Sequence, residues 1–242
     1  MADSVTRSGG TQAPRMLVLG GWSPGPLWEI SARRPDIEIC EPSIPMPPIG
    51  IRWLFNPYLV ALVLYILVLQ PMLQKQLDRL GERGGLLALA TLFPVLSLLL
   101  AAWLVTRVVR YAIHDCMRIA RKEIARFEPD VLIGFSWGGG VACWLLEDRS
   151  WRGHTVLLAP TVQAMSCVAR LPFPTIPSAV HLFHAEHDGF CPTSQRLKLE
   201  AMGCSSYVCR GDGHALLADA SVEAILRTLS RLLKPQGPQE RK

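Results

Sequence analysis

The segment Gly134–Gly138, with the sequence GFSWG, is the feature that most constrains the fold of this chain. The apolar run Asp130–Ile133 before it is typical of a strand, and the small residues after it lead into the predicted helix Gly138–Leu146. A strand, a tight turn that carries a serine, and a helix form a nucleophile elbow, whose turn holds the serine backbone in a strained conformation. The dipole of the helix favours negative charge beside Ser136. The segment therefore predicts an α/β fold with a reactive serine; the alternative is a glycine-rich turn with an idle serine.

Partners for the serine follow further along the chain. A serine hydroxyl becomes an effective nucleophile when a base takes its proton and an acid holds that base in the right tautomer. A strand pattern that begins at Ala179 ends in Asp188, and the short strand Ser206–Cys209 is followed by His214. The chain order Ser, Asp, His differs from the orders in chymotrypsin and subtilisin. Asp188 and His214 are therefore the candidate acid and base.

Both candidates have alternatives. Glu186 could be the acid in place of Asp188, which could be a turn residue before Gly189. His214 could be an ordinary loop histidine, with Asp212 capping the helix that follows. The sequence favours Asp188 and His214 because each comes just after a predicted strand.

We predict no metal and no cofactor. The spacing of the histidines at 181, 184 and 187 with Glu186 fits no zinc helix motif. The chain also shows no phosphate loop, no dinucleotide-binding fingerprint and no nucleic-acid motif. A nucleic-acid partner is therefore not expected.

At these residues the chain resembles the α/β-hydrolase superfamily, of the serine esterase and lipase type. The matching segments are GFSWGG at 134–139, HAEHDGFCP at 184–192 and GDGHALL at 211–217, and LVLGGWS at 17–23 resembles the family's strand and oxyanion-hole loop. The resemblance covers about 14–48 and 111–233. It implies a mainly parallel sheet flanked by helices, and we expect a loop over the active site at Val162–Pro177.

The resemblance also implies a role for each matching residue. Ser136 is then the nucleophile, Asp188 the orienting acid and His214 the general base. The oxyanion donors are implied to be two backbone N–H groups, those of Trp137 and Trp22. Many family members have His-Gly where this chain has Gly20-Gly21, which leaves the register of the second donor open.

Two uncharged runs interrupt the resemblance. The first extends over about 53–73 and the second over Leu86–Thr106, broken by Pro94, and each is long enough to span a bilayer core. The polar stretch Gln74–Gly85 is predicted to be a turn between them. These runs predict an inserted transmembrane helical hairpin, because helices of a soluble core normally keep a polar stripe. The alternatives are a hydrophobic cap over the active site and a pair of buried core helices.

This organisation fits the length and the composition. Residues 14–50 and 107–234 are predicted to form one discontinuous catalytic domain, 51–106 the hairpin, and 1–13 and 235–242 disordered tails. The chain has 242 residues, enough for one α/β domain, and its hydrophobic content of 50% agrees with two spans.

The flanking charges predict how the hairpin is oriented. Cations are more numerous on the flanks of the hairpin than in its turn, so the catalytic domain is expected to face the cytosol. The flanking cations are Arg52, Arg107, Arg110, Arg118, Arg121 and Lys122, and the turn carries Lys75, Arg79 and Arg83. The N-terminus is polar and lacks the apolar core of a signal peptide, and the 7 scattered cysteines suit a reducing compartment.

The predicted function is that of a membrane-anchored serine hydrolase that cleaves carboxylic esters or thioesters through an acyl-enzyme. Its expected partners are a small-molecule or lipid-like ester substrate and membrane lipids, with no particular oligomeric state. The alternative is a non-catalytic membrane protein that uses a hydrolase scaffold to bind partners. Epoxide and haloalkane hydrolases are disfavoured by the serine at the elbow.

Overall fold

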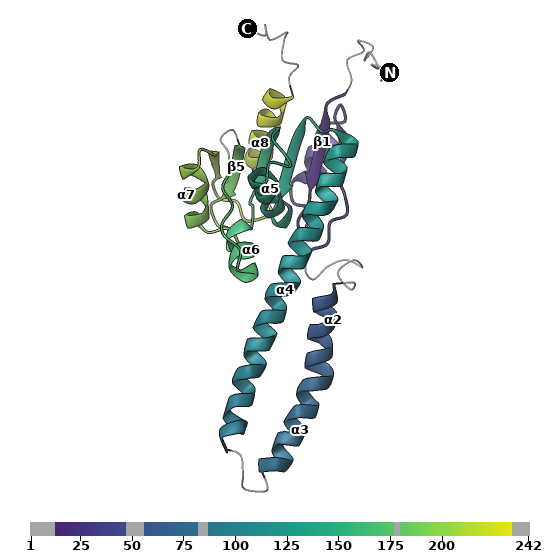
Figure 1. The fold of residues 1–242 in the computed structure, drawn as a ribbon. Coiled ribbons are helices and arrows are strands. Elements are labelled where there is room, and N and C mark those ends of the chain that lie inside the picture. The colour runs from purple at the N-terminus through teal and green to yellow at the C-terminus, as the bar shows by residue number, and fades with distance from the viewer. Residues whose placement is uncertain (1–12, 47–55, 82–86, 177–179, 234–242) are drawn as a thin grey trace, which may run out of the picture.

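A parallel sheet forms the centre of the α/β domain (Figure 1). The computed structural model describes residues 13–46, 56–81, 87–176 and 180–233. In these ranges six strands form one sheet in the order β2-β1-β3-β4-β5-β6, and every neighbouring pair is parallel. The strands are β1 (Arg15–Leu19), β2 (Glu38–Cys40), β3 (Val131–Phe135), β4 (His154–Leu158), β5 (Val180–Ala185) and β6 (Ser205–Cys209). The predicted α/β class with a mainly parallel sheet is confirmed.

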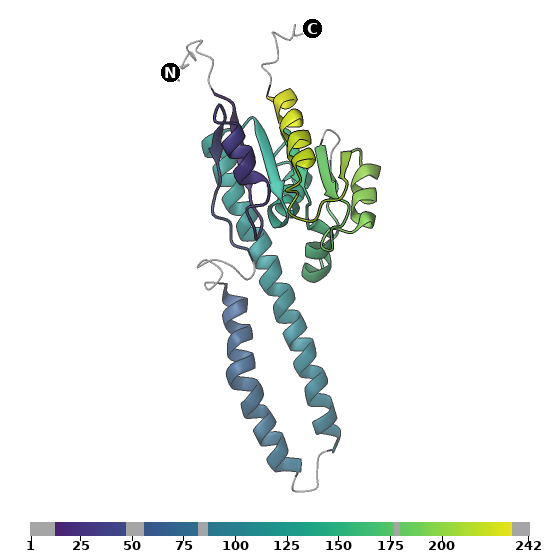
Figure 2. The same cartoon turned by 180° about the vertical axis from the view of Figure 1, so that it is seen from behind.

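Helices cover both faces of the sheet. One face carries α4 (Leu87–Phe127), α5 (Trp137–Glu147) and α6 (Val162–Ala169). The opposite face carries α1 (Leu27–Arg33) and α8 (Asp219–Leu232), which lie in front of the sheet in Figure 2. The remaining helix of the domain is α7 (Thr193–Ala201), which comes between β5 and β6 along the chain.

Strand β1 shows how the sequence divides its side chains between two cores. Successive side chains of a strand point to opposite faces. Leu17 and Leu19 belong to the apolar core under α4 and α5, whereas Met16 and Val18 belong to the core under α1 and α8. All four are almost completely buried. A strand buried on both faces has to be continuously apolar, which explains the run MLVL.

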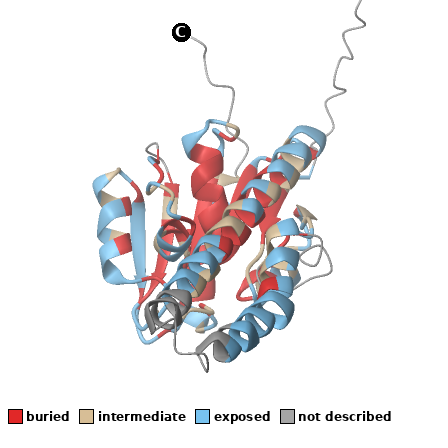
Figure 3. Cartoon of the chain, turned by 60° about the horizontal axis from the view of Figure 1, so that its bottom comes forward, coloured by how far each residue is buried: buried red, intermediate tan, exposed pale blue. Residues whose placement is uncertain are grey.

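The insert between β2 and the rest of α4 projects away from the sheet as a long helical hairpin (Figure 1). Its first arm runs without a break through α2 (Pro57–Leu64), a short π-helix (Tyr65–Leu69) and α3 (Gln70–Gly81). Its second arm is the first half of α4, a helix of 41 residues that continues into the domain. The side chains described in the two arms, up to Gln76 and from Val95 to Trp103, are largely exposed, unlike the red, buried sheet in Figure 3. The described hairpin is therefore neither a pair of buried core helices nor a cap folded over the domain.

Two sequence expectations differ from the structure, and others lie outside the described residues. The stretch Gln74–Gly85 was expected to be a turn, but α3 continues through Gly81, because Gln, Lys, Leu and Arg are good helix formers. The expected loop Val162–Pro177 begins with the helix α6, whose sequence VQAMSCVA contains neither glycine nor proline. The expected disordered tails, apart from residue 13, lie outside the described residues, as do Arg52, Arg83 and the segments 51–55 and 82–86.

Asn56 fixes the base of the hairpin to the domain. Its side-chain oxygen accepts hydrogen bonds from the Tyr58 N–H (3.0 Å) and the Leu59 N–H (3.3 Å), so it is the N-cap of α2. Its amide nitrogen donates to the carbonyl oxygen of Val108 in α4 at 3.0 Å. The side chain is buried, so one polar group stabilises the start of the first arm and its contact with the second.

Candidate active site

Ser136 occupies a sharp turn between β3 and α5. Its backbone angles are φ 52° and ψ −115°, a region that non-glycine residues rarely adopt. The glycines around it are required by close packing. A Cβ added to Gly138 would lie 2.0 Å from the carbonyl oxygen of Leu19, and one added to Gly134 would lie 2.7 Å from the Cα of Gly139. The strand, strained serine and helix that the sequence predicts are all present.

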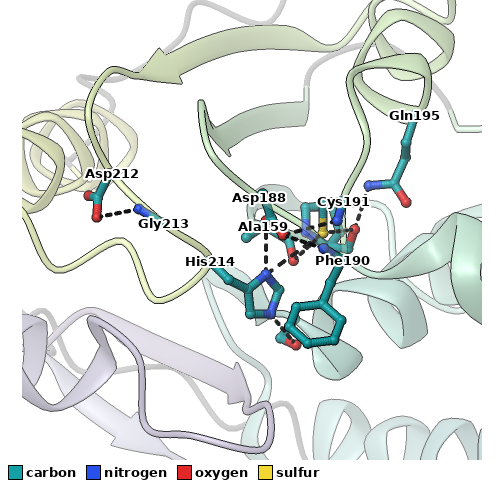
Figure 4. Close-up of polar contacts among 10 residues, drawn as sticks. Ala159, Asp188, Phe190, Cys191, Gln195, Asp212, Gly213 and His214 are labelled. Atoms are coloured by element: carbon teal, nitrogen blue, oxygen red, sulfur yellow. Dashed lines mark hydrogen bonds and ion pairs between the residues drawn. The ribbon is translucent and has the colours of Figure 1, made fainter.

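Ser136, His214 and Asp188 form a continuous chain of hydrogen bonds. The Nε2 atom of His214 lies 2.8 Å from the Ser136 Oγ, and its Nδ1 atom lies 2.8 Å from the Asp188 Oδ2. Figure 4 shows the imidazole ring of His214 next to Asp188, with the Phe190 ring beside it. The three residues follow β3, β5 and β6, so the parallel sheet brings them together at the edge formed by the carboxyl ends of its strands.

The Asp188 carboxylate is held in one orientation by its backbone neighbours. Its Oδ1 atom accepts hydrogen bonds from the Phe190 N–H (2.8 Å) and the Cys191 N–H (3.0 Å), which leaves Oδ2 for His214. Burial by itself would raise the pKa of Asp188, but the hydrogen bonds from His214 and the two N–H groups outweigh it, so the pKa is lowered. The group is therefore a carboxylate at neutral pH and can stabilise a positive charge on the imidazole.

The other acidic residues near these loops have different contacts. The Glu186 Oε2 accepts a hydrogen bond from the Gly211 N–H at 2.8 Å and supports the turn after β6. The Asp212 carboxylate accepts from the Gly213 N–H (3.0 Å) and from the Ala218 N–H (3.1 Å), just before α8. Of the acids that the sequence leaves open, Asp188 is the one whose carboxylate contacts His214.

The predicted oxyanion donors are the backbone N–H groups of Trp137 and Trp22. Trp137 is the first residue of α5, and the Gly20–Trp22 loop passes directly over the serine, because a Cβ added to Gly21 would lie 2.6 Å from the Ser136 Cβ. Within the described part of the chain, neither the Trp137 N–H nor the Trp22 N–H donates a hydrogen bond. Both predicted donors are thus free to bind a ligand.

A cavity of about 450 Å³ opens beside the Ser136 hydroxyl. Its walls are mostly apolar, and they come from the Trp22 loop, the elbow, α4, α6 and the loop after β5. The lining residues are Trp22, Ser23, Val109, Ser136, Trp137, Thr161, Ala164, Met165, Val168, Phe190 and His214. A larger hollow of about 1050 Å³ lies at the opposite, amino end of the sheet, away from Ser136 and His214. The smaller cavity is therefore the candidate substrate pocket.

The sequence placed a wall of the active site at Val162–Pro177, and this stretch does line the pocket, but as the helix α6. Val109 belongs to the helix that continues from the hairpin, and Ala164, Met165 and Val168 belong to α6, where a loop was expected. An apolar residue at these positions is equally typical of any buried helix face, so its type alone gives no sign of a pocket. Their role depends on the crossing of α4 over α6, which no local pattern encodes.

One cluster has the donor atoms for a metal ion but not the right chemistry. One ligand atom each of Asp188, Cys191 and His214 lies within 4.8 Å of the others. The Cys191 thiol donates to the carbonyl oxygens of Ala159 (3.1 Å) and Pro160 (2.9 Å), and burial raises its pKa. A metal is bound by a thiolate, so this neutral, hydrogen-bonded thiol is a poor ligand. The carboxylate and the imidazole are already bonded to each other.

Comparison with solved structures identifies the fold. The chain is similar to esterase PE8, with a TM-score of 0.54 and 14% identity over 91% of this chain and 93% of that one. A putative hydrolase of the alpha/beta superfamily from Xanthomonas campestris pv. campestris gives a TM-score of 0.49 and 18% identity over 90% of this chain and 99% of that one. No family model and no curated protein matches the sequence. Together with the parallel sheet and the elbow, the likeness to the esterase identifies the α/β-hydrolase fold.

Proposed function

We propose that this protein is a serine hydrolase that cleaves carboxylic ester or thioester bonds, and that its hairpin anchors it in a membrane. The observation that carries the proposal is the hydrogen-bonded chain from Asp188 through His214 to Ser136. A fold likeness alone would not support an activity, because one fold can host many functions.

The geometry supports an acyl-enzyme mechanism. The Ser136 Oγ attacks the carbonyl carbon while the His214 Nε2 takes its proton. The Asp188 carboxylate stabilises the resulting imidazolium, and the N–H groups of Trp137 and Trp22 bind the developing oxyanion. The imidazolium then protonates the leaving alcohol or thiol, which departs from the acyl-enzyme. Water, deprotonated by His214, attacks the acyl carbon and releases the acid and the free serine.

The exposed apolar surface of the hairpin supports the membrane anchor. The helical segment Pro57–Gln76 spans 20 residues, and only 6% of its most apolar stretch is buried against the rest of the protein. At 1.5 Å per residue such a helix is about 30 Å long, the thickness of a bilayer core. Water would solvate this surface poorly, whereas lipid tails would cover it. The cations Arg107 and Arg110 at the base of the hairpin favour a cytosolic catalytic domain.

Labelling with a fluorophosphonate tests the proposal, because this reagent reacts covalently with activated serines. The full chain in detergent should be labelled, Ser136→Ala should not, and Ser205→Ala, which changes an exposed serine of β6, should be labelled like the wild type. Labelling of Ser136→Ala to the wild-type extent would assign the reactive serine elsewhere. A wild type that is folded but neither labelled nor able to hydrolyse esters would favour the non-catalytic scaffold.

A further inference from the structure

We propose that the substrate pocket takes the apolar chain of an ester or thioester that resides in the same bilayer as the hairpin. The chain would enter between α4 and α6. This inference rests on the proposed function and specifies the class and the source of the substrate. It is based on where the pocket lies relative to the base of the hairpin, and on what lines it.

An aromatic cluster marks the level at which the hairpin meets the domain. The ring of Tyr58 in α2 contacts the rings of Trp103 and Tyr111 in α4, with centroids 6.3 Å apart in both pairs. The Arg107 guanidinium lies 5.2 Å from the centre of the Trp103 ring. Aromatic residues with a polar edge, accompanied by a cation, gather where the hydrocarbon core of a membrane meets its headgroups. The cluster therefore places the bilayer surface at the base of the hairpin.

The pocket lies at nearly the same level. Val109, which lines it, comes two residues after Arg107 and six after Trp103. Along a helix these separations amount to about 3 Å and about 9 Å. The opposite wall is α6, which lies at the end of the domain nearest to the hairpin (Figure 1). Val168 of α6 is 44% exposed although it lines the pocket, so it lies at the mouth.

The polar and apolar lining residues suit the two parts of such a substrate, its ester group and its apolar chain. The polar side chains are those of Ser23, Ser136, Thr161 and His214, and the other lining residues are apolar or aromatic. A volume of about 450 Å³ is within the range of ordinary ligand pockets. An ester whose carbonyl lies at Ser136 would have its apolar chain along Met165 and Val168, toward the bilayer surface.

Hydrogen bonds join α4 to the pocket wall near its mouth. The Arg110 side chain donates hydrogen bonds to the carbonyl oxygen of Ala169 and, at 2.7 Å, to that of Arg170. These carbonyls are at the C-terminal end of α6, where a cation also interacts favourably with the helix dipole. Arg110 therefore ties α6 to the helix that continues into the hairpin.

The test uses the full chain in phosphatidylcholine vesicles with two substrates. A butyrate p-nitrophenyl ester reaches the site from water, whereas the palmitate ester stays in the bilayer. Among short esters that reach the site from water, butyrate included, we expect kcat/KM to rise about fourfold for each methylene group that the pocket buries. Palmitate ester in the vesicles that hold the protein should be cleaved at least about tenfold faster than the same ester in separate vesicles, because entry from the bilayer removes the transfer of the chain through water.

Variants at the mouth separate this inference from the proposed function. Val168→Glu places a charge in the path of the chain and should reduce cleavage of the palmitate ester at least about tenfold more than that of the butyrate ester. Ala164→Trp, which adds no charge, should shift the preference toward shorter chains. Leu197→Glu, on the exposed side of α7 outside the pocket, is the matched control and should leave both rates unchanged.

Each result has one meaning. Cleavage of butyrate with no preference for longer chains, or equal losses on both esters in the two mouth variants, would overturn the inference and leave the hydrolase intact. Equal rates for palmitate in the same and in separate vesicles would also overturn it. Absence of both fluorophosphonate labelling and butyrate cleavage would refute the proposed function, and the inference with it.

Discussion

Replacing Asp188 by asparagine should inactivate the protein through the tautomer of His214, and the contacts of Asp188 determine how. The two backbone donors, Phe190 N–H and Cys191 N–H, both point at Oδ1. In Asp188→Asn the amide oxygen will take this place, because the reverse orientation leaves two N–H donors without acceptors at about 1–3 kcal/mol each. The amide NH2 then faces the Nδ1 atom of His214.

An NH2 group that faces Nδ1 favours the imidazole tautomer with its proton on Nε2. That nitrogen lies 2.8 Å from the Ser136 Oγ and, once protonated, cannot accept the serine proton. Loss of the correct tautomer in a triad lowers kcat by about 10⁴-fold, or about 5.4 kcal/mol of transition-state stabilisation. The fold should be preserved, since the side chains are nearly the same size.

The assay is kcat for p-nitrophenyl butyrate at neutral pH, with the labelling rate by fluorophosphonate as a second readout. Glu186→Gln is the control, because its amide oxygen can still accept the Gly211 N–H, and both rates should stay within about twofold of the wild type. The reasoning would be refuted if Asp188→Asn kept more than a tenth of the wild-type kcat, or if Glu186→Gln were the variant that lost activity.

Three further predictions concern pH, the loop over the serine and the hairpin. The pKa of Asp188 is lowered in the folded state, so its ionised form stabilises the fold fully at pH above its unfolded pKa of about 4. This stabilisation should be lost as pH falls through the folded-state pKa. The difference in melting temperature between wild type and Asp188→Asn should therefore shrink as pH is lowered over this range. Gly21→Ala puts a methyl group 2.6 Å from the Ser136 Cβ. If the serine is displaced by about 1 Å as a result, the acylation rate should fall about 100-fold. Gly189→Ala, with open space around its added Cβ, is the control and should be neutral. The protein should stay in the membrane pellet after alkaline carbonate, and release into the supernatant would show that the hairpin is not an integral anchor.

The reactive serine could be predicted from the sequence because its signal is local. Gly134, Gly138 and Gly139 are needed wherever a strand turns into a helix this tightly, and added Cβ atoms there would meet backbone at 2.9 Å or less. The alternation of buried side chains in β1 is also local, since a strand turns each residue to the opposite face. The length of the uncharged runs likewise follows from composition alone.

The sequence favoured Asp188 over Glu186 as the acid, but local patterns left Glu186 open as an alternative. They are two residues apart on one loop, and the distance of each carboxylate from His214 depends on how the loop after β5 packs against the loop after β6. Both segments are brought together by strand pairing between Ala185 and Cys209. The same holds for the helices: the prolines beyond Leu171 suggested a loop, but α6 forms before them and packs against α4.

The sequence by itself determined the elbow, the order of the three polar residues, the parallel α/β class and the apolar insert, because each follows from residue types within one strand, turn or helix. The tertiary structure alone decided that Asp188 meets His214, that α4 continues from the hairpin into the domain, and that Val109 of α4 and Val168 of α6 line the same pocket. These contacts join segments far apart in the chain. Their distances are set by the packing of whole helices on the sheet, which no single stretch of sequence specifies.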